Sequence, residues 1–148
     1  MKNNKYYTPE IEEFRVGFEY EELNLTSVYD DKWRFNIKKN IFTQEIWKPG
    51  YSNWNFLDNL KDGKIRVKYL DAQDIEELGF EKATTQIHFR KDDIEIVLWD
   101  IKDIHIRRVI DSSLTVNGVS RILVEPLYQG TILNKSELKW ILTRIGVL

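Results

Sequence analysis

The sequence predicts an α+β fold, a mainly antiparallel sheet of about six strands covered by a C-terminal helix and one short helix. Three observations predict this class. Apolar and polar residues alternate in short runs over 83–110, as in strands with one covered face. Helix-capping residues precede apolar segments at 71–78 and 134–146. The pair Asn117-Gly118 is a strong signal for a tight hairpin turn.

The stretch Ala83–Ile110 is predicted to be an antiparallel meander of three strands, separated by 91–93 and 100–103. The only two histidines of the chain lie here, in the similar tetrapeptides Ile87-His88-Phe89-Arg90 and Ile104-His105-Ile106-Arg107. Because side chains alternate between the two faces of a strand, each histidine should project from the same face as its arginine.

Further strands are predicted on both sides of this meander. The first, from Phe14, should place on one face Phe14, Val16, Phe18 and Tyr20. Residues 32–38 alternate in the same way and form its natural antiparallel partner. Residues 64–69 should turn Ile65, Val67 and Tyr69 inward. The last strand, 121–127, contains Pro126, which indicates an edge strand or a bulge.

Residues 40–63 fit neither a helical nor a strand period, and they contain Trp47, Tyr51, Trp54 and Phe56. Two interpretations are open. These aromatic side chains fill one end of the core, as large aromatic residues mostly do, or they form an exposed stacking surface.

Both helices have clear start signals. Asp71 is the predicted N-cap of the short helix, with Asp74 at the third helical position. Asn134 should cap the C-terminal helix together with Glu137, and Gly146 should end it. The apolar stripe of this last helix consists of Leu138, Ile141, Leu142 and Ile145.

The composition is that of a single globular domain over 1–148, with 42% hydrophobic residues and a net charge of −2. The chain has no cysteine, which excludes disulfides and thiolate ligands. No apolar run approaches the roughly 20 residues that span a bilayer. We therefore expect a cytoplasmic protein that has no cofactor and no metal and does not bind membranes.

Three stretches carry a resemblance to a family: YYTPEIEEFRVGFEYE, IRVKYLDAQDIEELGF and LYQGTILNKSELKWILTRIGV. They resemble an uncharacterised family of small proteins from Bacteroidota and their phages and prophages. The resemblance implies no activity and no ligand. It implies a mobile-element setting, in which host interaction or counter-defence is expected and the protein would work in the host cytoplasm.

The meander supplies the candidate ligand-binding residues. If the apolar faces of its strands align, the opposite face carries His88, Arg90, Glu95, Trp99, His105 and Arg107. This face is interpreted in two ways. It holds a phosphate-bearing ligand, with arginine as the fork and Trp99 as the stacking plane, or it is an ordinary sheet face on which Glu95 neutralises its cross-strand neighbours.

Catalytic signatures are missing from the sequence: there is no phosphate-binding glycine loop, no zinc-protease motif and no nucleophile elbow. The paired histidines are similar to the His-x-Ser/Thr motifs of two-histidine phosphoesterases, but arginine replaces the hydroxyl residue in both. A third interpretation uses the outward cations of 64–69 as a nucleic-acid surface, although the net charge of −2 disfavours it. These cations are Lys64, Arg66 and Lys68.

The sequence thus favours a small non-enzymatic binding protein of a phage or mobile element. Its partner would be a host protein or a small phosphorylated, nucleotide-like ligand that it sequesters. The alternatives are a phosphoester-directed enzyme using the paired histidines, and a nucleic-acid-binding accessory protein. Because the last strand is expected at a sheet edge, a homo-oligomer is also predicted.

Overall fold

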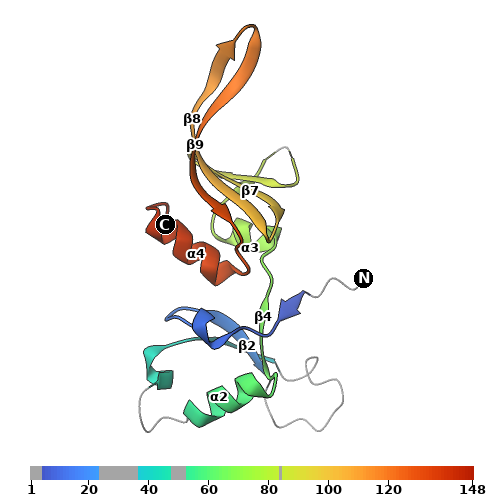
Figure 1. The fold of residues 1–148 in the computed structure, drawn as a ribbon, viewed down its shortest axis with the longest axis vertical. Helices are drawn as coiled ribbons and strands as arrows, with labels where there is room; N and C mark the ends of the chain where they lie inside the picture. Colours follow the sequence, from blue (N-terminus) through green and yellow to red (C-terminus); the bar gives the residue numbers. More distant parts are fainter. Residues whose placement is uncertain (1–4, 24–36, 48–52, 84) are drawn as a thin grey trace. The chain divides into compact units, whose positions relative to one another are not determined.

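The computed structural model describes residues 5–23, 37–47, 53–83 and 85–148, and the chain forms two compact units, Met1–Tyr69 and Leu70–Leu148 (Figure 1). Each unit has its own antiparallel sheet and its own buried cluster. The α+β class is confirmed. The strands, however, divide between sheets of four and five strands instead of forming one sheet of about six, because each sheet buries one face against a separate cluster.

The first unit contains a small antiparallel sheet in the order β1-β4-β2-β3. Its elements are β1 (Tyr6–Tyr7), η1 (Ile11–Glu13), β2 (Glu19–Leu23), β3 (Ile37–Ile41), η2 (Gln44–Trp47), α2 (Asn53–Lys61) and β4 (Ile65–Lys68). The core of this unit is mainly aromatic, and its buried members are Phe14, Phe18, Tyr20, Phe42, Phe56, Ile65 and Val67.

The strand predicted from Phe14 is wrong over its first half, because β2 begins only at Glu19. Phe14 ends the short helix η1, and a turn follows in which the Phe18 amide donates to the Arg15 carbonyl and Gly17 has a φ of +91°. Phe14 and Phe18 are both buried, but Val16 is 65% exposed. The spacing of the aromatic residues therefore reflects packing around a turn.

The other predictions for this unit have mixed outcomes. β3 pairs with β2 as expected, although 32–36 lie outside the described residues. Ile65 and Val67 are buried on β4. In 40–63, the helix α2 was not predicted, and Phe56 on it is buried, as the core interpretation requires. The side chains of Trp47, Tyr51 and Trp54 lie outside the described parts.

The second unit is built on an antiparallel sheet with consecutive neighbours, β5-β6-β7-β8-β9. Its elements are α3 (Ala72–Glu77), β5 (Glu81–Lys82), β6 (His88–Lys91), β7 (Ile94–Asp100), β8 (Asp103–Val116), β9 (Val119–Gly130) and α4 (Lys135–Arg144). The predicted meander is therefore confirmed as β6, β7 and β8, and the last strand, β9, lies at the sheet edge as expected.

The capping residues of both helices act as the sequence predicts, with one variation. The Asp71 side chain accepts from the Asp74 amide, and the Asp74 carboxylate accepts from the Asp71 amide. Asn134 accepts from the Glu137 amide, but the Glu137 carboxylate accepts from Leu133, one residue before the cap. The start of α4 is thus fixed by two side chains that satisfy backbone donors.

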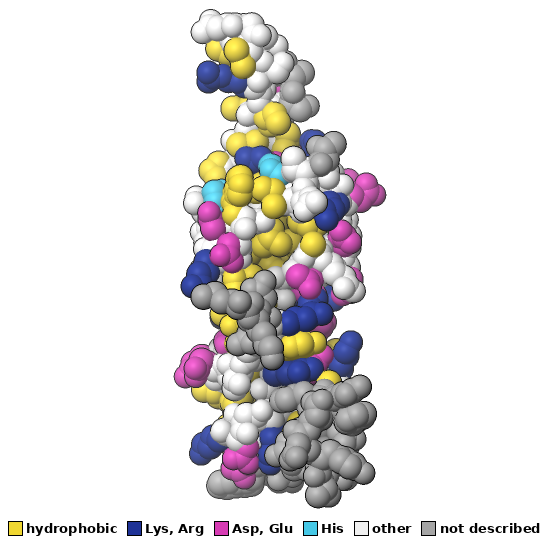
Figure 2. Space-filling model, turned by 90° about the vertical axis from the view of Figure 1, so that its right-hand side faces the viewer, with side chains coloured by type: hydrophobic (Ala, Val, Ile, Leu, Met, Phe, Trp, Pro, Cys, Tyr) yellow, Lys and Arg dark blue, Asp and Glu magenta, His cyan; other side chains and the backbone are white. Residues whose placement is uncertain are grey.

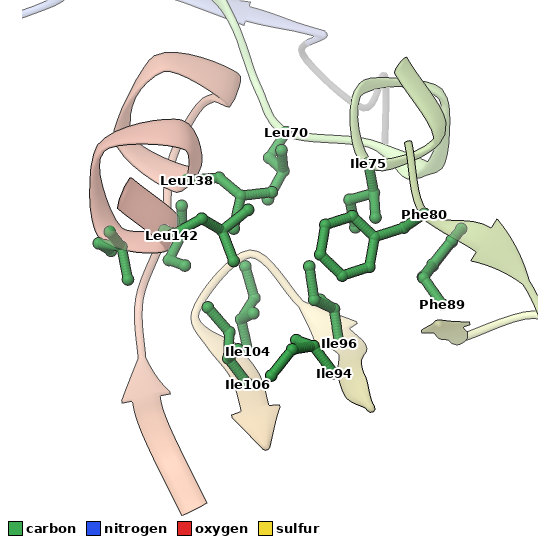
Figure 3. Close-up of a cluster of buried hydrophobic side chains, with 12 residues drawn as sticks. Leu70, Ile75, Phe80, Phe89, Ile94, Ile96, Ile104, Ile106, Leu138 and Leu142 are labelled. Atoms are coloured by element: carbon green, nitrogen blue, oxygen red, sulfur yellow. The ribbon is translucent and has the colours of Figure 1, made fainter. Parts of the chain in front are cut away.

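One face of the second sheet is covered by α3 and α4. Figure 3 shows Leu138 and Leu142 of α4 and Ile75 of α3 pointing toward the isoleucines of β7 and β8. Among the buried members of this cluster, Ile75, Phe89, Ile96, Ile104, Ile106, Ile132, Leu138 and Leu142 have no exposed surface. The alternate residues of β6, β7 and β8, many of them polar, stand on the opposite face of the sheet.

The hairpin of β8 and β9 extends well past the other strands (Figure 1). β7 pairs with β8 only as far as Arg108, so among the described residues no third strand pairs with residues 110–123, here called the arm. At its tip Asn117 and Gly118 have φ values of +52° and +77°. Two successive positive φ values are those of a type I′ turn, as the sequence predicts.

Replacing Leu142 with alanine should lower the free energy of unfolding by roughly 2–5 kcal/mol, because the leucine is fully buried between α4 and the sheet. Urea denaturation would measure this change. The matched control is Lys139→Ala on the exposed side of α4, which should stay within about 0.5 kcal/mol of the wild type. Equal effects of the two substitutions would contradict the packing of α4.

The presence of two compact units does not decide whether they fold together, so one domain over 1–148 stays a prediction. If it holds, heating should unfold the chain in one two-state transition, with equal calorimetric and van't Hoff enthalpies. Differential scanning calorimetry would measure both. Two separate transitions would show that each unit is a domain of its own.

Candidate functional site

Strand pairing places five of the predicted site residues, His88, Arg90, Glu95, His105 and Arg107, on the sheet face opposite to α3 and α4. We call this surface the polar face and define it by His88, Arg90, Glu95, Val97, Trp99, His105 and Arg107. Strand pairing arranges six of them in two rows across β6, β7 and β8. One row is Arg90, Glu95 and Arg107, and the other is His88, Val97 and His105.

Glu95 is the centre of the polar face. One carboxylate oxygen accepts a hydrogen bond from Nδ1 of His88 at 2.8 Å, and the other accepts from Nε of Arg107 at 2.6 Å. The Glu95 side chain is 14% exposed. Burial alone would raise the pKa of this carboxyl, but the hydrogen bonds from His88 and Arg107 and their positive charge outweigh burial, and the pKa is lowered.

An ionised carboxylate only accepts hydrogen bonds, so Nδ1 of His88 carries a proton. In the neutral imidazole Nε2 is then an acceptor, and in the cation it becomes a donor. This nitrogen makes no hydrogen bond with any described residue. His88 therefore presents to solvent a group whose hydrogen-bonding role changes with protonation.

His105 is separate from the Glu95 cluster. Its Nε2 lies 2.9 Å from a carboxylate oxygen of Asp103, two residues earlier on β8. His88 and His105 are both cross-strand neighbours of Val97, so their strands are about 10 Å apart. Figure 2 shows both histidines on one side of the molecule, beside a hydrophobic area.

Val97 and Asp103 belong to the site, although the sequence interpretation did not include them. Val97 is only 2% exposed, yet it faces away from the isoleucine core of this unit. Val97 lies two residues from Glu95 on β7, and this spacing could have assigned it to the polar face from the sequence. Asp103 lies in the predicted separator 100–103, and its spacing of two residues from His105 is the signal that could have identified this contact.

Arg90 and Trp99 are the most open members of the polar face. Nε of Arg90 donates to the Asp92 carbonyl at 3.3 Å, and its side chain is otherwise exposed. Trp99 is 61% exposed and lies at the irregularity in the pairing of β7 with β8. Trp99 makes no ring contact with the other described side chains. Its indole surface is therefore open to a ligand.

Two of the three predicted cations, Lys64 just before β4 and Arg66 on β4, have local partners, which weakens the nucleic-acid interpretation. Lys64 lies 3.3 Å from Asp62, and Arg66 donates to Glu21 at 2.8 Å. The Arg66 guanidinium also stacks 3.8 Å from the ring centre of Tyr6. Their charge is largely matched within the first unit.

Comparisons with protein families, curated proteins and solved structures find no match to this chain. Within the described ranges, no three histidine or acidic side chains are grouped as a metal site would require. No helix in those ranges is long and apolar enough to span a membrane. Function must therefore be inferred from the polar face itself.

The substitution Glu95→Gln should destabilise the protein by roughly 1–3 kcal/mol at neutral pH, because it removes a carboxylate that accepts two charge-assisted hydrogen bonds. The lowered pKa fixes the sign of the pH dependence. The stabilisation by Glu95 is fully present above its ordinary pKa of 4.5 and is lost as the pH falls through the lowered value.

Urea denaturation of both proteins at about pH 7, 5 and 3 would test this dependence. The difference between them should be constant from neutral pH to about 5 and then shrink. A difference that is the same at all three pH values would mean that the ionisation of Glu95 makes no contribution.

Proposed function

We propose that the chain is a non-enzymatic binding protein that holds a small phosphate-bearing ligand on the polar face. One observation carries this proposal: each basic side chain of the face is held in place through a single nitrogen. His88 is held through Nδ1 and His105 through Nε2, and both arginines are held through Nε. Their remaining nitrogens make no hydrogen bond with described residues.

This arrangement reduces the entropic cost of binding an anion. A free arginine side chain loses rotamer freedom when it contacts a ligand, whereas Arg107 is already fixed by Glu95. Its two Nη groups remain as planar donors that match phosphate oxygens. The row Arg90, Glu95 and Arg107 carries one net positive charge, which favours an anion at this row although the whole chain is slightly acidic.

Three different surfaces follow one another along β7. Glu95, Val97 and Trp99 are two residues apart, and each step is about 6.6 Å. The arginine row comes first, then the two histidines on either side of the buried Val97, then the open indole of Trp99. A phosphate, a sugar-sized body and a stacking ring in this order describe a nucleotide-like ligand.

We also propose that the protein belongs to a phage or another mobile element. This part of the proposal rests on the sequence resemblance alone. In that setting the ligand is a host molecule, and holding it without converting it would remove it from a host pathway. The protein would then act stoichiometrically. Alternatively, the molecule that the protein binds in this setting is a host protein.

A phosphoester-directed enzyme is the second candidate, and one observation favours it. Each histidine is paired with a carboxylate, His88 with Glu95 and His105 with Asp103, as in sites where a carboxylate orients a general base. The two candidates differ in the fate of the ligand. Sequestration returns the ligand unchanged after denaturation of the complex, whereas an enzyme releases product.

Calorimetric titration with a panel of nucleotides and cyclic nucleotides tests the binding proposal. Arg90→Ala and Arg107→Lys should each weaken binding of the preferred ligand by about 1.5–3 kcal/mol, because one removes and the other replaces a planar charged donor. Arg108→Ala is the matched control. Arg108 is the next residue on β8, pairs with Asp93 and Glu125, and points to the opposite face.

Equal affinities of the wild type and both arginine variants would contradict the proposed site. The absence of binding to every nucleotide in the panel would also contradict the proposed site. A host protein would then be the proposed partner.

A further inference from the structure

The arm exposes five large apolar side chains. Its side chains include Ile110, Val116, Val119, Ile122 and Leu123, which are between 39% and 59% exposed. Two strands without a third strand or a covering helix are at best marginally stable in water. An exposed apolar hairpin therefore needs a surface to pack against.

The free edge of β9 is regular along the arm. Between the pairs Val109–Val124 and Asp111–Leu123, β8 advances by two residues and β9 by one. From there to the pair Leu114–Arg121, β8 again has one residue more. These two irregularities thus place the extra residue on β8, and β9 is regular from Val119 to Glu125. The next irregularity, where the extra residue lies on β9, comes only at Pro126 and Tyr128.

The charges of β9 are placed symmetrically. Arg121 and Glu125 each lie two residues from Leu123, on the same face of the strand. Arg121 makes no ion pair with the described residues. Glu125 accepts from Arg108 at 3.0 Å, but 49% of its side chain is exposed, which leaves room for a second guanidinium.

We propose that β9 pairs antiparallel with β9 of a second copy about a two-fold axis at Leu123. Leu123 then faces its own equivalent, and Ile122 of each copy faces Val124 of the other. Arg121 of each copy faces Glu125 of the other, so two ion pairs flank the axis. This pairing joins the two five-stranded sheets into one continuous sheet.

The charges select both the partner and the register. A shift by two residues in either direction places Arg121 or Glu125 opposite Leu123 and leaves the charge without its partner. Larger shifts place Arg121 opposite Arg121, or Glu125 opposite Glu125, where like charges destabilise the sheet. A second copy supplies the complementary edge at the one register that satisfies both charges.

Cysteine cross-linking tests the axis directly, because the chain contains no cysteine. In the proposed register the Cα atoms of the two Leu123 residues are about 4.5–5.5 Å apart, a distance that a disulfide spans. The Leu123→Cys variant should therefore form a covalent dimer under mild oxidation at about 10 µM protein. The control Val119→Cys places the two thiols roughly 26 Å apart and should stay monomeric on a non-reducing gel.

Charge reversal tests the register independently. Arg121→Glu and Glu125→Arg should each raise the dissociation constant of the dimer by at least roughly tenfold, since each puts like charges opposite each other twice. The double variant restores opposite charges at both positions and should return to within about threefold of the wild type. Sedimentation equilibrium measures the dissociation constants, and thermal melting of each variant checks that the fold is retained.

Three results would overturn the proposal. The wild type could sediment as a monomer at all concentrations, which would exclude a second copy as the partner of β9. Leu123→Cys and Val119→Cys could cross-link equally, which would remove the axis. The double charge reversal could fail to restore a dimer that both single variants weaken, which would exclude this register. None of these measurements uses a ligand of the polar face, so their outcome is independent of the proposed function.

Discussion

The strict alternation of side chains along β7 and β8 is the constraint on which the second unit depends. Ile96, Ile104 and Ile106 have no exposed surface because α3 and α4 cover that face of the sheet. Since the period of a strand is two residues, every residue between them must stand on the other face. A slip by one residue would bury Glu95 in the isoleucine core and expose the isoleucines, at a cost that excludes it. The hydrophobic core thus determines which polar side chains are presented together.

Glu95 has both a structural and an orienting role. A carboxylate that is 14% exposed loses much of its hydration, and two charge-assisted hydrogen bonds compensate for that loss. The same two bonds fix His88 and Arg107. They also neutralise part of the positive charge, so the polar face is not a plain basic patch. Rigid donors with a small net charge favour recognition of a compact anion over general attraction to polyanions.

Short-range signals made much of the second unit predictable. The caps at Asp71 and Asn134 and the turn at Asn117 are local, and the alternation of the meander assigned six site residues to one face. The ion pairs of the site were not predictable in the same way. Glu95 is directly opposite two arginines, yet it bonds one of them and the diagonal His88, a choice that depends on side-chain geometry. The division into two sheets likewise has no local signal, and neither does a turn that buries two phenylalanines around Gly17.

The different regularity of β8 and β9 has a consequence for the free edge. A bulged strand bends and twists, and a bulge on an edge strand is one of the devices that prevent unwanted pairing. Along the arm the extra residues lie on β8, the inner strand, while β9 on the outside remains regular and contains no lysine. Pro126 lies at the sheet end of the regular stretch and leaves the segment around Leu123 unprotected. A regular, apolar edge is an aggregation hazard unless it is paired, and this is the physical reason to regard it as an interface.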